Sequence, residues 1–222
     1  NGGFASALDA DTEGEEGLFY VWDLDEVTSV LGEEDGAIFT KAYGISSAGN
    51  WEGHNVLHLE QSLEETARAA GDTEVQGFID RIDTMRTKLN AVRETRTKPA
   101  VDDKVLTSWN AMMIGAMALG FRVTADVRYL DAAIAAADFI DTSLTRDGRL
   151  LRTYREGQAH LNAYLEDYAH LAEALIELYE VSGEGRFLAR ATAIADTMLS
   201  RFGTSEGGAF YTTANDHETL II

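Results

Sequence analysis

Acidic and aromatic side chains are grouped in a few short stretches of this sequence, and these stretches are where it could do chemistry. The first is residues 9–17, in which Asp9 and Asp11 lie among glutamates and glycines. Paired carboxylates can serve as general acid and general base when their surroundings separate their pKa values. A solvated acidic loop is the alternative. An EF-hand calcium loop is excluded, because Tyr20 stands where its closing glutamate belongs.

A second acidic pair, Asp102 and Asp103, precedes a predicted helix that carries Trp109 and Asn110 one turn further on. Capping and the helix dipole explain acids at such a position without any function. The functional alternative is a sugar site, because a sugar ring needs an apolar surface to stack on and polar groups around its rim. The sequence leaves both interpretations open.

Three more stretches are candidates. Residues 166–168 (Glu-Asp-Tyr) place two adjacent acids inside an otherwise apolar helix, where they need a partner or water. Residues 50–55 combine Trp51, Glu52 and His54 in one loop. A zinc pair of His54 with His58 is not expected, because the segment does not look helical. Residues 215–218 are a polar run that includes His217 and Glu218.

From these stretches we select two sets of candidate residues. The candidate catalytic residues are Asp9, Asp11, Asp102 and Asp103. The candidate substrate-binding residues are Trp51, Trp109, Asn110, Glu166, Asp167 and Tyr168. We expect no metal site and no cofactor, since the sequence has no P-loop, no G-x-G-x-x-G, no G-x-S-x-G and no H-E-x-x-H motif.

The composition limits the classes of partner. The 222 residues carry 38 acidic against 18 basic side chains, a net charge of −20. Such a balance argues against nucleic acids and anionic membranes as partners, and no apolar run is long enough to span a bilayer. The acidity fits either a salt-adapted protein or an ordinary acidic one. Cysteine is absent, which fits a reducing, cytoplasmic location.

A repeat organises the second half of the chain. Residues 108–140 and 166–198 align without a gap, and each reads as a pair of helices. The predicted helices cover about 104–122, 126–144, 162–181 and 185–202. In each pair a buried inner helix precedes an amphipathic outer one, which predicts a curved layer or a closed double ring of helices. A ring of six pairs would need more residues than the chain has, so we expect an open ring or one completed by residues that are missing. The apolar triplet Leu220-Ile221-Ile222 at the end of the sequence leads us to expect a piece of a longer protein.

The local signals give further expectations. The helix at 104–122 looks apolar nearly all round and should be buried on most sides. In the next helix Val127, Leu130, Ile134, Ala137 and Ile140 should face inward. Residues 2–17 read as a long loop and 19–22 as a short strand. Capping boxes are expected at Asp23 with Glu26 and at Ser62 with Glu65, and helices at about 24–32, 34–43, 62–71 and 72–98.

Several motifs resemble a known family. They are Gly2-Gly3-Phe4, residues 6–11, residues 13–17, Phe19-Tyr20-Val21-Trp22, Gly49-Asn50-Trp51-Glu52-Gly53, residues 102–110, residues 165–169, and Gly207-Gly208 with Phe210-Tyr211. Together they are similar to the thioredoxin-domain-containing, spermatogenesis-associated protein 20-like family, over nearly the whole chain.

The resemblance implies a fold. Members of that family carry a thioredoxin-like domain followed by an (α/α)₆ toroid, which is similar to N-acylglucosamine 2-epimerases and to several glycosidases. The chain then is all-α: residues 1–222 are a fragment of a single (α/α)₆ toroid of helical hairpins with short β-prone connections. The thioredoxin-like domain and the end of the toroid are absent from it. Asn110-Ala111 stands where the family usually has Asn-Gly, and the histidines expected of the epimerases on inner helices are not evident.

Three functions remain open at this point. The first is a carbohydrate-binding or carbohydrate-processing toroid with glycosidase- or epimerase-like acid/base chemistry, whose partner is a sugar or another small molecule. The second is a non-catalytic scaffold that binds a ligand or protein and serves the missing thioredoxin-like domain. The third is a purely structural acidic protein of a salt-loving organism, whose acids serve hydration alone.

Overall fold

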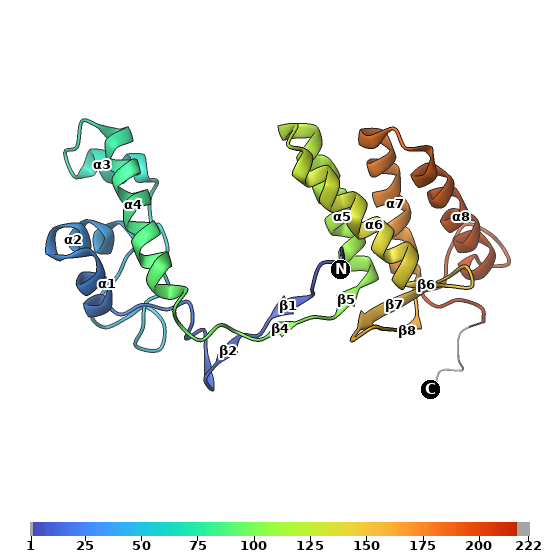
Figure 1. Ribbon diagram of the computed structural model, residues 1–222, viewed down its shortest axis with the longest axis horizontal. Helices are drawn as coiled ribbons and strands as arrows, with labels where there is room; N and C mark the ends of the chain where they lie inside the picture. The colour runs from blue at the N-terminus through green and yellow to red at the C-terminus, as the bar shows by residue number, and fades with distance from the viewer. Residues whose placement is uncertain (1, 217–222) are drawn as a thin grey trace. The chain divides into compact units, whose positions relative to one another are not determined.

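The computed structural model describes residues 2–216 and divides them into two compact units (Figure 1). Unit 1 comprises residues 2–7 and 101–216, and unit 2 comprises residues 8–100. Two short strands, β1 (Ala7–Leu8) and β4 (Val101–Asp102), pair with each other. Each unit is described by itself below, and a single toroid domain over residues 1–222 stays a prediction.

Unit 1 contains two helical hairpins that repeat in sequence and in structure. The first pairs α5 (Thr107–Thr124) with α6 (Val127–Ser143), and the second pairs α7 (Leu165–Ser182) with α8 (Gly185–Phe202). Thr107 and Leu165, the first residues of α5 and α7, are 58 positions apart, and so are the last residues of these helices. The repeat read from the sequence is therefore confirmed.

The two hairpin turns also correspond. Each inner helix ends at a residue in the left-handed conformation, Ala125 (φ 57°) after α5 and Gly183 (φ 72°) after α7. A left-handed residue after the last turn lets its amide bond back to a helix carbonyl and stops the helix. Asp126 then caps α6 by accepting a hydrogen bond from the Arg128 amide. Glycine is suited to this conformation, and Ala125 adopts it at some steric cost.

The strands of unit 1 lie at the end of the helices from which α5 and α7 begin (Figure 1). The strand β7 (Arg149–Arg155) is antiparallel to each of its partners. Those partners are β5 (Val105–Leu106), β6 (Thr145–Arg146) and β8 (Gln158–Asn162). Because β5 runs directly into α5 and β8 nearly into α7, this small sheet fixes where both helices start.

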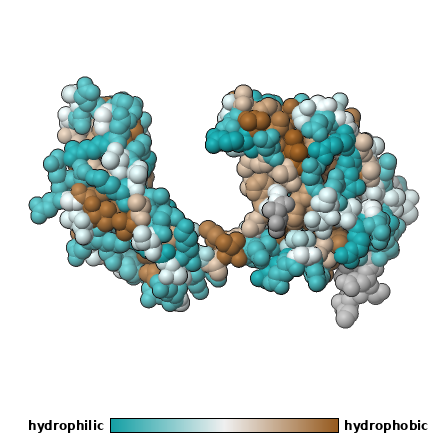
Figure 2. Space-filling view, in the orientation of Figure 1, coloured by the Kyte–Doolittle hydropathy of each residue, from teal (hydrophilic) through white to brown (hydrophobic). Residues whose placement is uncertain are grey.

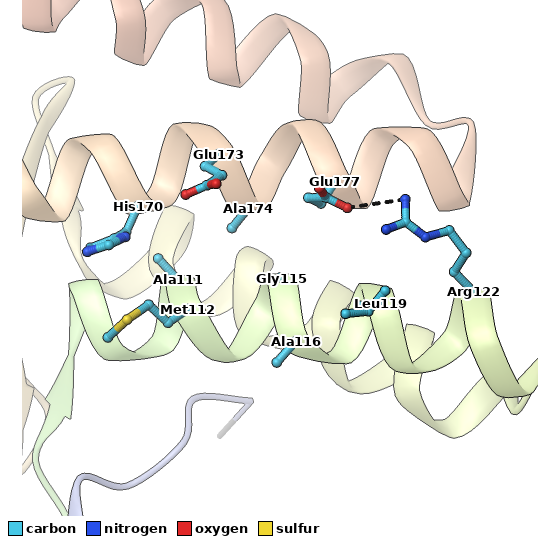
Figure 3. Close-up of a pocket in the computed structure, with 10 residues that line it drawn as sticks. All are labelled: Ala111, Met112, Gly115, Ala116, Leu119, Arg122, His170, Glu173, Ala174 and Glu177. Carbon is cyan, nitrogen blue, oxygen red and sulfur yellow. Dashed lines mark ion pairs between the residues drawn. The ribbon is translucent and has the colours of Figure 1, made fainter.

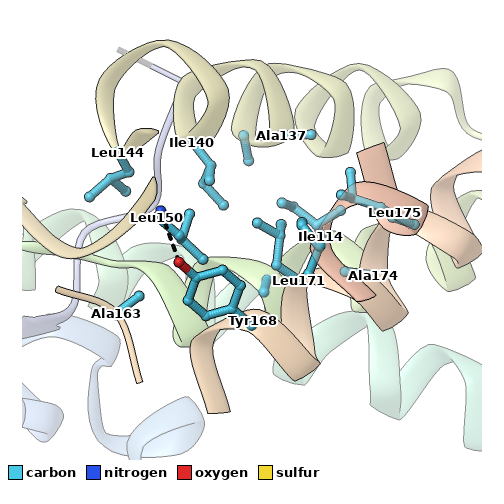
Figure 4. Close-up of a cluster of buried hydrophobic side chains, with 14 of the residues drawn as sticks. Ile114, Ala137, Ile140, Leu144, Leu150, Ala163, Tyr168, Leu171, Ala174 and Leu175 are labelled. Carbon is cyan, nitrogen blue, oxygen red and sulfur yellow. Dashed lines mark hydrogen bonds between the residues drawn. The ribbon is translucent and has the colours of Figure 1, made fainter. Parts of the chain in front are cut away.

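The core of unit 1 lies between α5, α6 and α7, where α7 packs on α5 on one side and on α8 on the other (Figure 4). Its largest fully buried side chains include Ile114, Ile140, Leu150, Leu171 and Leu175. Burying each such side chain contributes about 1.5–3 kcal/mol relative to leaving it exposed. The helices α5 and α7 are thus the inner pair, and α6 and α8 flank them.

Unit 2 is built of four helices and a tight hairpin. The helices are α1 (Leu24–Leu31), α2 (Glu33–Ala42), α3 (Leu63–Ala69) and α4 (Val75–Arg93). The hairpin joins β2 (Asp11–Thr12) to β3 (Glu15–Glu16). Its core collects Val27, Phe39, Ile82 and Met85 from α1, α2 and α4. The capping box of Ser62 with Glu65 is present as predicted.

The predicted all-α class, with helical hairpins and short β connections, is confirmed. Three local predictions are wrong. Residues 19–22 do not form a strand, and only Trp22 makes an isolated bridge, to Asn55. Residues 2–17 are not one long loop, since they contain β1 and the β2–β3 hairpin. Val127 does not face inward: it is exposed at the first turn of α6, whereas Ala137 and Ile140 are buried.

The prediction that the helix now labelled α5 is buried on most sides is also wrong. Hydrophobic patches are visible over this part of unit 1, on an otherwise largely hydrophilic surface (Figure 2). The exposed apolar side chains of α5 are Trp109, Met112, Met113, Leu119 and Val123. Its partners α6 and α7 cover only part of its circumference, which composition alone could not reveal. No helix within residues 2–216 is both long and apolar enough to cross a membrane.

Candidate functional site

Asp167 is a buried hub at the start of α7. Its side chain has no exposed surface, and its Oδ1 atom accepts a hydrogen bond from the Ser108 amide at 3.1 Å. Its Oδ2 atom accepts bonds from the Tyr164 amide at 2.9 Å and from Nη1 of Arg152 at 3.0 Å. One carboxylate thus links the first turn of α5, the first turn of α7 and strand β7.

Opposing electrostatic effects act on the carboxyl group of Asp167. Burial raises the pKa of the Asp167 carboxyl, and the hydrogen bonds from the Tyr164 amide, the charge of Arg152 and the bonds to Ser108 oppose that rise. The Arg152 guanidinium also bonds Glu166 at 2.7 Å and lies over the Tyr164 ring. The oxygens of Asp167 are therefore engaged inside the protein, and its role as a substrate contact stays a prediction.

Asn110 is a second buried hub, and it fixes the N-terminal segment. Its Oδ1 atom accepts a hydrogen bond from the Phe4 amide at 2.7 Å, and its Nδ2 atom donates to the carbonyls of Phe4 and Leu106. Gly2 and Gly3 allow this segment to approach α6: a Cβ atom on Gly2 would lie 2.7 Å from the Ala135 carbonyl oxygen. The motif Gly2-Gly3-Phe4 therefore has a structural explanation, and substrate binding by Asn110 stays a prediction.

The remaining predicted residues of unit 1 divide into buried and exposed ones. Tyr168 is buried in the core, where its hydroxyl accepts a hydrogen bond from the Leu150 amide at 3.2 Å (Figure 4). Asp103 is exposed and accepts a bond from Nε of Arg155 at 2.8 Å. Asp102 pairs with Lys104, and the hydrogen bond from that lysine lowers the pKa of Asp102. Trp109 is about half exposed on α5.

A groove lies between the inner helices α5 and α7 (Figure 3). Its volume is about 340 Å³, which is within the range for small-ligand sites. Small side chains form much of its surface: Ala111, Gly115 and Ala116 from α5 and Ala174 from α7. Because these residues are small, the two helices leave room between them instead of filling it.

The polar side chains of the groove come mainly from α7. Those of His170, Glu173 and Glu177 line it, and Arg122 of α5 lies 3.5 Å from Glu177. Neither His170 nor Glu173 has a hydrogen bond or an ion pair to any described residue. The groove therefore offers a base and an acid, one helical turn apart, that the fold itself does not use.

The first acidic stretch, residues 9–17, lies in unit 2 and forms a tight turn. Asp9 and Asp11 are both exposed, and Oδ1 of Asp9 accepts a hydrogen bond from the Asp11 amide at 3.1 Å. The turn residues Glu13 and Gly14 both have positive φ angles, 56° and 88°, as a two-residue type I′ hairpin requires. The catalytic role of the two aspartates stays a prediction.

The loop around Trp51 is locked to the start of α1. Asn55 is buried: its Oδ1 atom accepts a hydrogen bond from the Ser46 amide, and its Nδ2 atom donates to the carbonyls of Ser46 and Trp22. The backbones of Trp22 and Asn55 also pair as an antiparallel bridge. Such a bridge places the residue after Trp22 opposite the residue before Asn55, so Asp23 meets His54. Their Oδ1 and Nδ1 atoms are 2.8 Å apart.

Two stretches singled out in the sequence are thereby brought together inside unit 2. Gly17 ends the acidic stretch, and a Cβ atom on it would lie 3.2 Å from the Trp51 ring. Trp51 is half-buried against this glycine, and its backbone pairs with that of His54. The contact serves packing, and substrate binding by Trp51 stays a prediction.

The predicted capping box at Asp23 is wrong. No side-chain hydrogen bond caps α1, because Asp23 turns to His54 and Glu26 turns to Arg96. Nη2 of Arg96 lies 2.8 and 2.9 Å from the two carboxylate oxygens of Glu26. Nη1 of Arg96 donates to the carbonyls of Phe19 and Val21, and the guanidinium lies over the Trp22 ring.

The structure describes only part of the polar run at residues 215–218. Asp216 accepts hydrogen bonds from Arg149 at 2.7 and 2.8 Å and also pairs with Arg201. The bond from Arg149 lowers the pKa of Asp216. His217, Glu218 and the terminal Leu220-Ile221-Ile222 lie outside the described residues. Between residues 2 and 216, no group of three or more His, Asp or Glu side chains is placed to hold a metal ion.

Sequence reasoning missed His170 and Glu173. A signal was present: Glu166, His170, Glu173 and Glu177 are spaced by four, three and four residues, which puts them on one face of a helix. The pair of Asp23 with His54 left no such local signal, because 31 positions separate the two residues.

The sequence is similar to several known proteins. It is 33% identical to spermatogenesis-associated protein 20 of Homo sapiens over 246 aligned positions, which cover 95% of this chain. The chain is a homologue of spermatogenesis-associated protein 20. The same protein of Mus musculus is 31% identical, and an uncharacterised protein of Caenorhabditis elegans is 26% identical. The chain spans 31% of the length of the human relative. No family model matches the chain.

Solved structures with a similar fold are more distant. Cellobiose 2-epimerase from Bacillus thermoamylovorans is 13% identical, with a TM-score of 0.45 over 82% of this chain and 57% of that one. A GH76 α-mannanase of Bacteroides thetaiotaomicron is 15% identical, with a TM-score of 0.46 over 78% and 55%. A sugar epimerase from a ruminal bacterium is 16% identical, with a TM-score of 0.46 over 95% and 50%. At these scores the likenesses carry no argument about what this chain does.

Proposed function

We propose that this chain is a carbohydrate-binding and carbohydrate-processing helical domain, and that its sugar lies in the groove between α5 and α7. The observation that carries the proposal is the pair of His170 and Glu173, which line an open groove without a partner among the described residues. Polar groups that the fold leaves unsatisfied at a concave surface are the usual mark of a binding site.

The rest of the groove suits a sugar ring. Met112 and Leu119 supply apolar surface, and Arg122, Glu173 and Glu177 supply hydrogen-bonding groups along the rim. A volume of about 340 Å³ accommodates a monosaccharide and part of a second ring. The groove lies on α5 and α7, whose packing against each other is extensive, so its walls are set by rigid elements.

His170 and Glu173 are also the groups that could transfer protons. Imidazole exchanges protons near neutral pH, and a carboxylate beside it can act as the partner base or acid. Asp102 is bound to Lys104 and Asp103 to Arg155, so these two acids are less available. The proposed chemistry is proton transfer on a bound sugar by the α7 pair.

The test uses residue-specific titration. D-mannose, cellobiose and N-acetyl-D-glucosamine are added to the chain while the histidine side chains are followed by ¹H–¹⁵N NMR. A saturable shift of the His170 resonance is expected with at least one sugar, and His170→Gln identifies that resonance. Glu173→Gln should weaken binding about tenfold, the equivalent of a lost charged hydrogen bond. New ¹H NMR signals from altered sugar would show processing.

Asp196→Asn is the matched control for Glu173→Gln. Asp196 is exposed on α8 and, like Glu173, has no polar partner among the described residues. Its variant should bind as the unchanged chain does. The proposal is wrong if no sugar shifts His170, or if Glu173→Gln and Asp196→Asn bind the sugar equally well.

One observation favours a second function, a non-catalytic scaffold. Several apolar side chains of α5 are exposed, among them Met112, Met113 and Val123, where hydrophobic patches are visible on unit 1 (Figure 2). Exposed apolar patches are typical of a surface covered by another protein part. On this alternative the groove binds no sugar. A missing thioredoxin-like domain, produced separately, would bind the chain and protect Val123→Cys from alkylation.

A further inference from the structure

Unit 2 contains a second cavity, of about 440 Å³, to which no role has been assigned. It is bordered by Thr12 of the β2–β3 hairpin, by Asp23 and His54, and by Thr95 and Thr97 after α4. Leu18, Phe19 and Val21 supply its apolar surface. Every one of these residues belongs to unit 2.

A usual local hydrogen bond is missing beside this cavity. Asp23 stands at the N-cap of α1, where it would ordinarily bond a free helix amide, and its side chain bonds His54 instead. Deviations from local preference of this kind are expected at functional sites. The diversion fixes an imidazole at the edge of the cavity.

The contact with Asp23 determines what His54 can do. A carboxylate only accepts hydrogen bonds, so Nδ1 of His54 carries the hydrogen in this pair. In the neutral ring Nε2 is then an acceptor, and Nε2 has no partner among the described residues. With the ring neutral, the cavity presents a fixed acceptor that suits a hydroxyl or an amine.

The charges of the cavity exclude an anion. Arg96 lines it, but both of its terminal nitrogens are bonded to Glu26 and to backbone carbonyls. The carboxylates of Asp23 and Glu13 border the same space. A phosphate or carboxylate ligand would meet these two negative charges, and among the described residues that line the cavity no cation is free to pair with it.

Thr12 supplies an independent observation. The residue is only 5% exposed, and its hydroxyl has no hydrogen-bond partner in the structure. A buried hydroxyl without a partner destabilises the fold, so its presence needs an explanation. Since Thr12 lines the cavity, a ligand there is the partner that we assign to this hydroxyl.

We infer that the unit 2 cavity binds a small polyhydroxy compound, uncharged or cationic, with one hydroxyl donating to Nε2 of His54 and another bonding Thr12. Thr95 and Thr97 offer further hydroxyls, and Phe19 offers an apolar surface for the face of a ring. The ligand class is that of sugars and amino sugars, and phosphorylated sugars are excluded. This site is independent of the groove on α5 and α7.

The experiment compares three related probes: D-glucose, D-glucosamine and D-glucose 6-phosphate. The histidine side chains are followed by ¹H–¹⁵N NMR, in which His54→Gln identifies the His54 signal. D-glucose and D-glucosamine should shift the His54 signal saturably, and D-glucose 6-phosphate should bind at least about tenfold more weakly. Because His54 and His170 are separate reporters, failure of one site is distinguishable from failure of the other.

Thr12→Val is the decisive variant. It keeps the shape of the side chain and removes the hydroxyl, so the melting temperature should stay the same or rise while D-glucose binds about tenfold more weakly. Thr84→Val, on the exposed surface of α4, is the matched control and should bind as before. Asp23→Asn should also weaken binding, because an amide can donate to Nδ1 and so favour the tautomer whose Nε2 is no longer an acceptor.

Three results would overturn the inference. One is a His54 signal that none of the three probes shifts. Another is a Thr12→Val chain that binds D-glucose as tightly as the unchanged chain. The third is D-glucose 6-phosphate binding as tightly as D-glucose at the His54 site.

Discussion

Two buried asparagines, Asn110 in unit 1 and Asn55 in unit 2, make the same set of bonds. Each side chain accepts from the amide of one residue and donates to its carbonyl, Phe4 for Asn110 and Ser46 for Asn55. Each also donates to one further carbonyl. In both units the side-chain amide of an asparagine thus fixes a segment that has no regular secondary structure.

The surroundings of the two asparagines differ. Near Asn110, Asp167 is buried and bonded on both oxygens. Next to Asn55, His54 borders a cavity with its Nε2 open, and the Thr12 hydroxyl has no partner. A saturated polar network stabilises a fold, and an unsaturated one beside a cavity indicates a ligand. The same kind of asparagine therefore belongs to a closed network in unit 1, whereas in unit 2 it lies beside the cavity for which we propose a ligand.

The largest expected effect comes from removing the unit 1 acid. Asp167→Ala leaves Arg152 short of a partner and the amides of Ser108 and Tyr164 unsatisfied. Loss of one partner of a buried pair costs about 3–5 kcal/mol, and the partial exposure of Arg152 favours the lower end. The melting temperature should fall by about 6–12 °C, measured by circular dichroism.

Asp196→Ala is the control for this change and should alter the free energy of unfolding by less than about 0.5 kcal/mol. An Asp167→Ala chain that melts with the control would show that the network around Asp167 is not structural. The contrast between the bonded network of Asp167 in unit 1 and the open groups of His54 and Thr12 in unit 2 would then no longer hold.

A smaller effect is expected from the asparagines themselves. Asn110→Ala and Asn55→Ala each leave backbone groups without partners, and each should lower the free energy of unfolding by about 2–3 kcal/mol. Denaturation in urea measures both. The two variants should differ in one respect: only Asn55→Ala should move the NMR signal of His54, since Asn55 fixes the loop that carries it.

An exposed asparagine would be a poor control for these two buried ones. A second pair of variants therefore carries Gln in place of Ala at the same two positions. Asn110→Gln and Asn55→Gln keep the amide but add a methylene in a packed site, which is also destabilising. Equal His54 shifts in the two alanine variants would contradict the assignment of separate roles.

The helices of this protein could be predicted from the sequence because their signals are local. The left-handed stop at Gly183 and the capping box of Ser62 with Glu65 lie within a few residues of what they determine. The 58-residue repeat is found by aligning the sequence with itself, and each of its helices has its own local apolar pattern. The exposure of Trp109 and Met112 could not be predicted, since it depends on which neighbours cover α5.

The candidate sites could be predicted only in part for the same reason. Asp23 pairs with His54 across 31 positions, and Glu26 with Arg96 across 70. The local pattern of Asp23 with Glu26 favoured a capping box, and these long-range pairs replaced it. Among the predicted residues, the sequence identified Asn110 and Asp167 as unusual, but it could not distinguish a saturated network from an open one.

The smallest expected effect is a difference in pH dependence between two carboxyls of unit 1. The hydrogen bond from Arg149 lowers the pKa of Asp216 below its ordinary value of 3.8, whereas burial raises the pKa of Asp167 above it. A lowered pKa contributes stability that is present above the unfolded pKa and lost as pH falls through the folded one. A raised pKa in an acid has the opposite effect on stability. It lowers the stability above the folded pKa, and this cost disappears as pH falls to the unfolded pKa.

Asp216→Asn and Asp167→Asn test these signs when urea denaturation is repeated between about pH 3 and pH 6. The stability difference between the unchanged chain and Asp216→Asn should shrink toward low pH, because protonation removes the ion pair with Arg149. The difference for Asp167→Asn should grow toward low pH. The Asp216 effect should be modest, since its side chain is 41% exposed and solvent screens the pair. Two differences that change with pH in the same direction would mean that Asp167 behaves as a surface carboxylate, and its distinction from Asp216 would lose its physical basis.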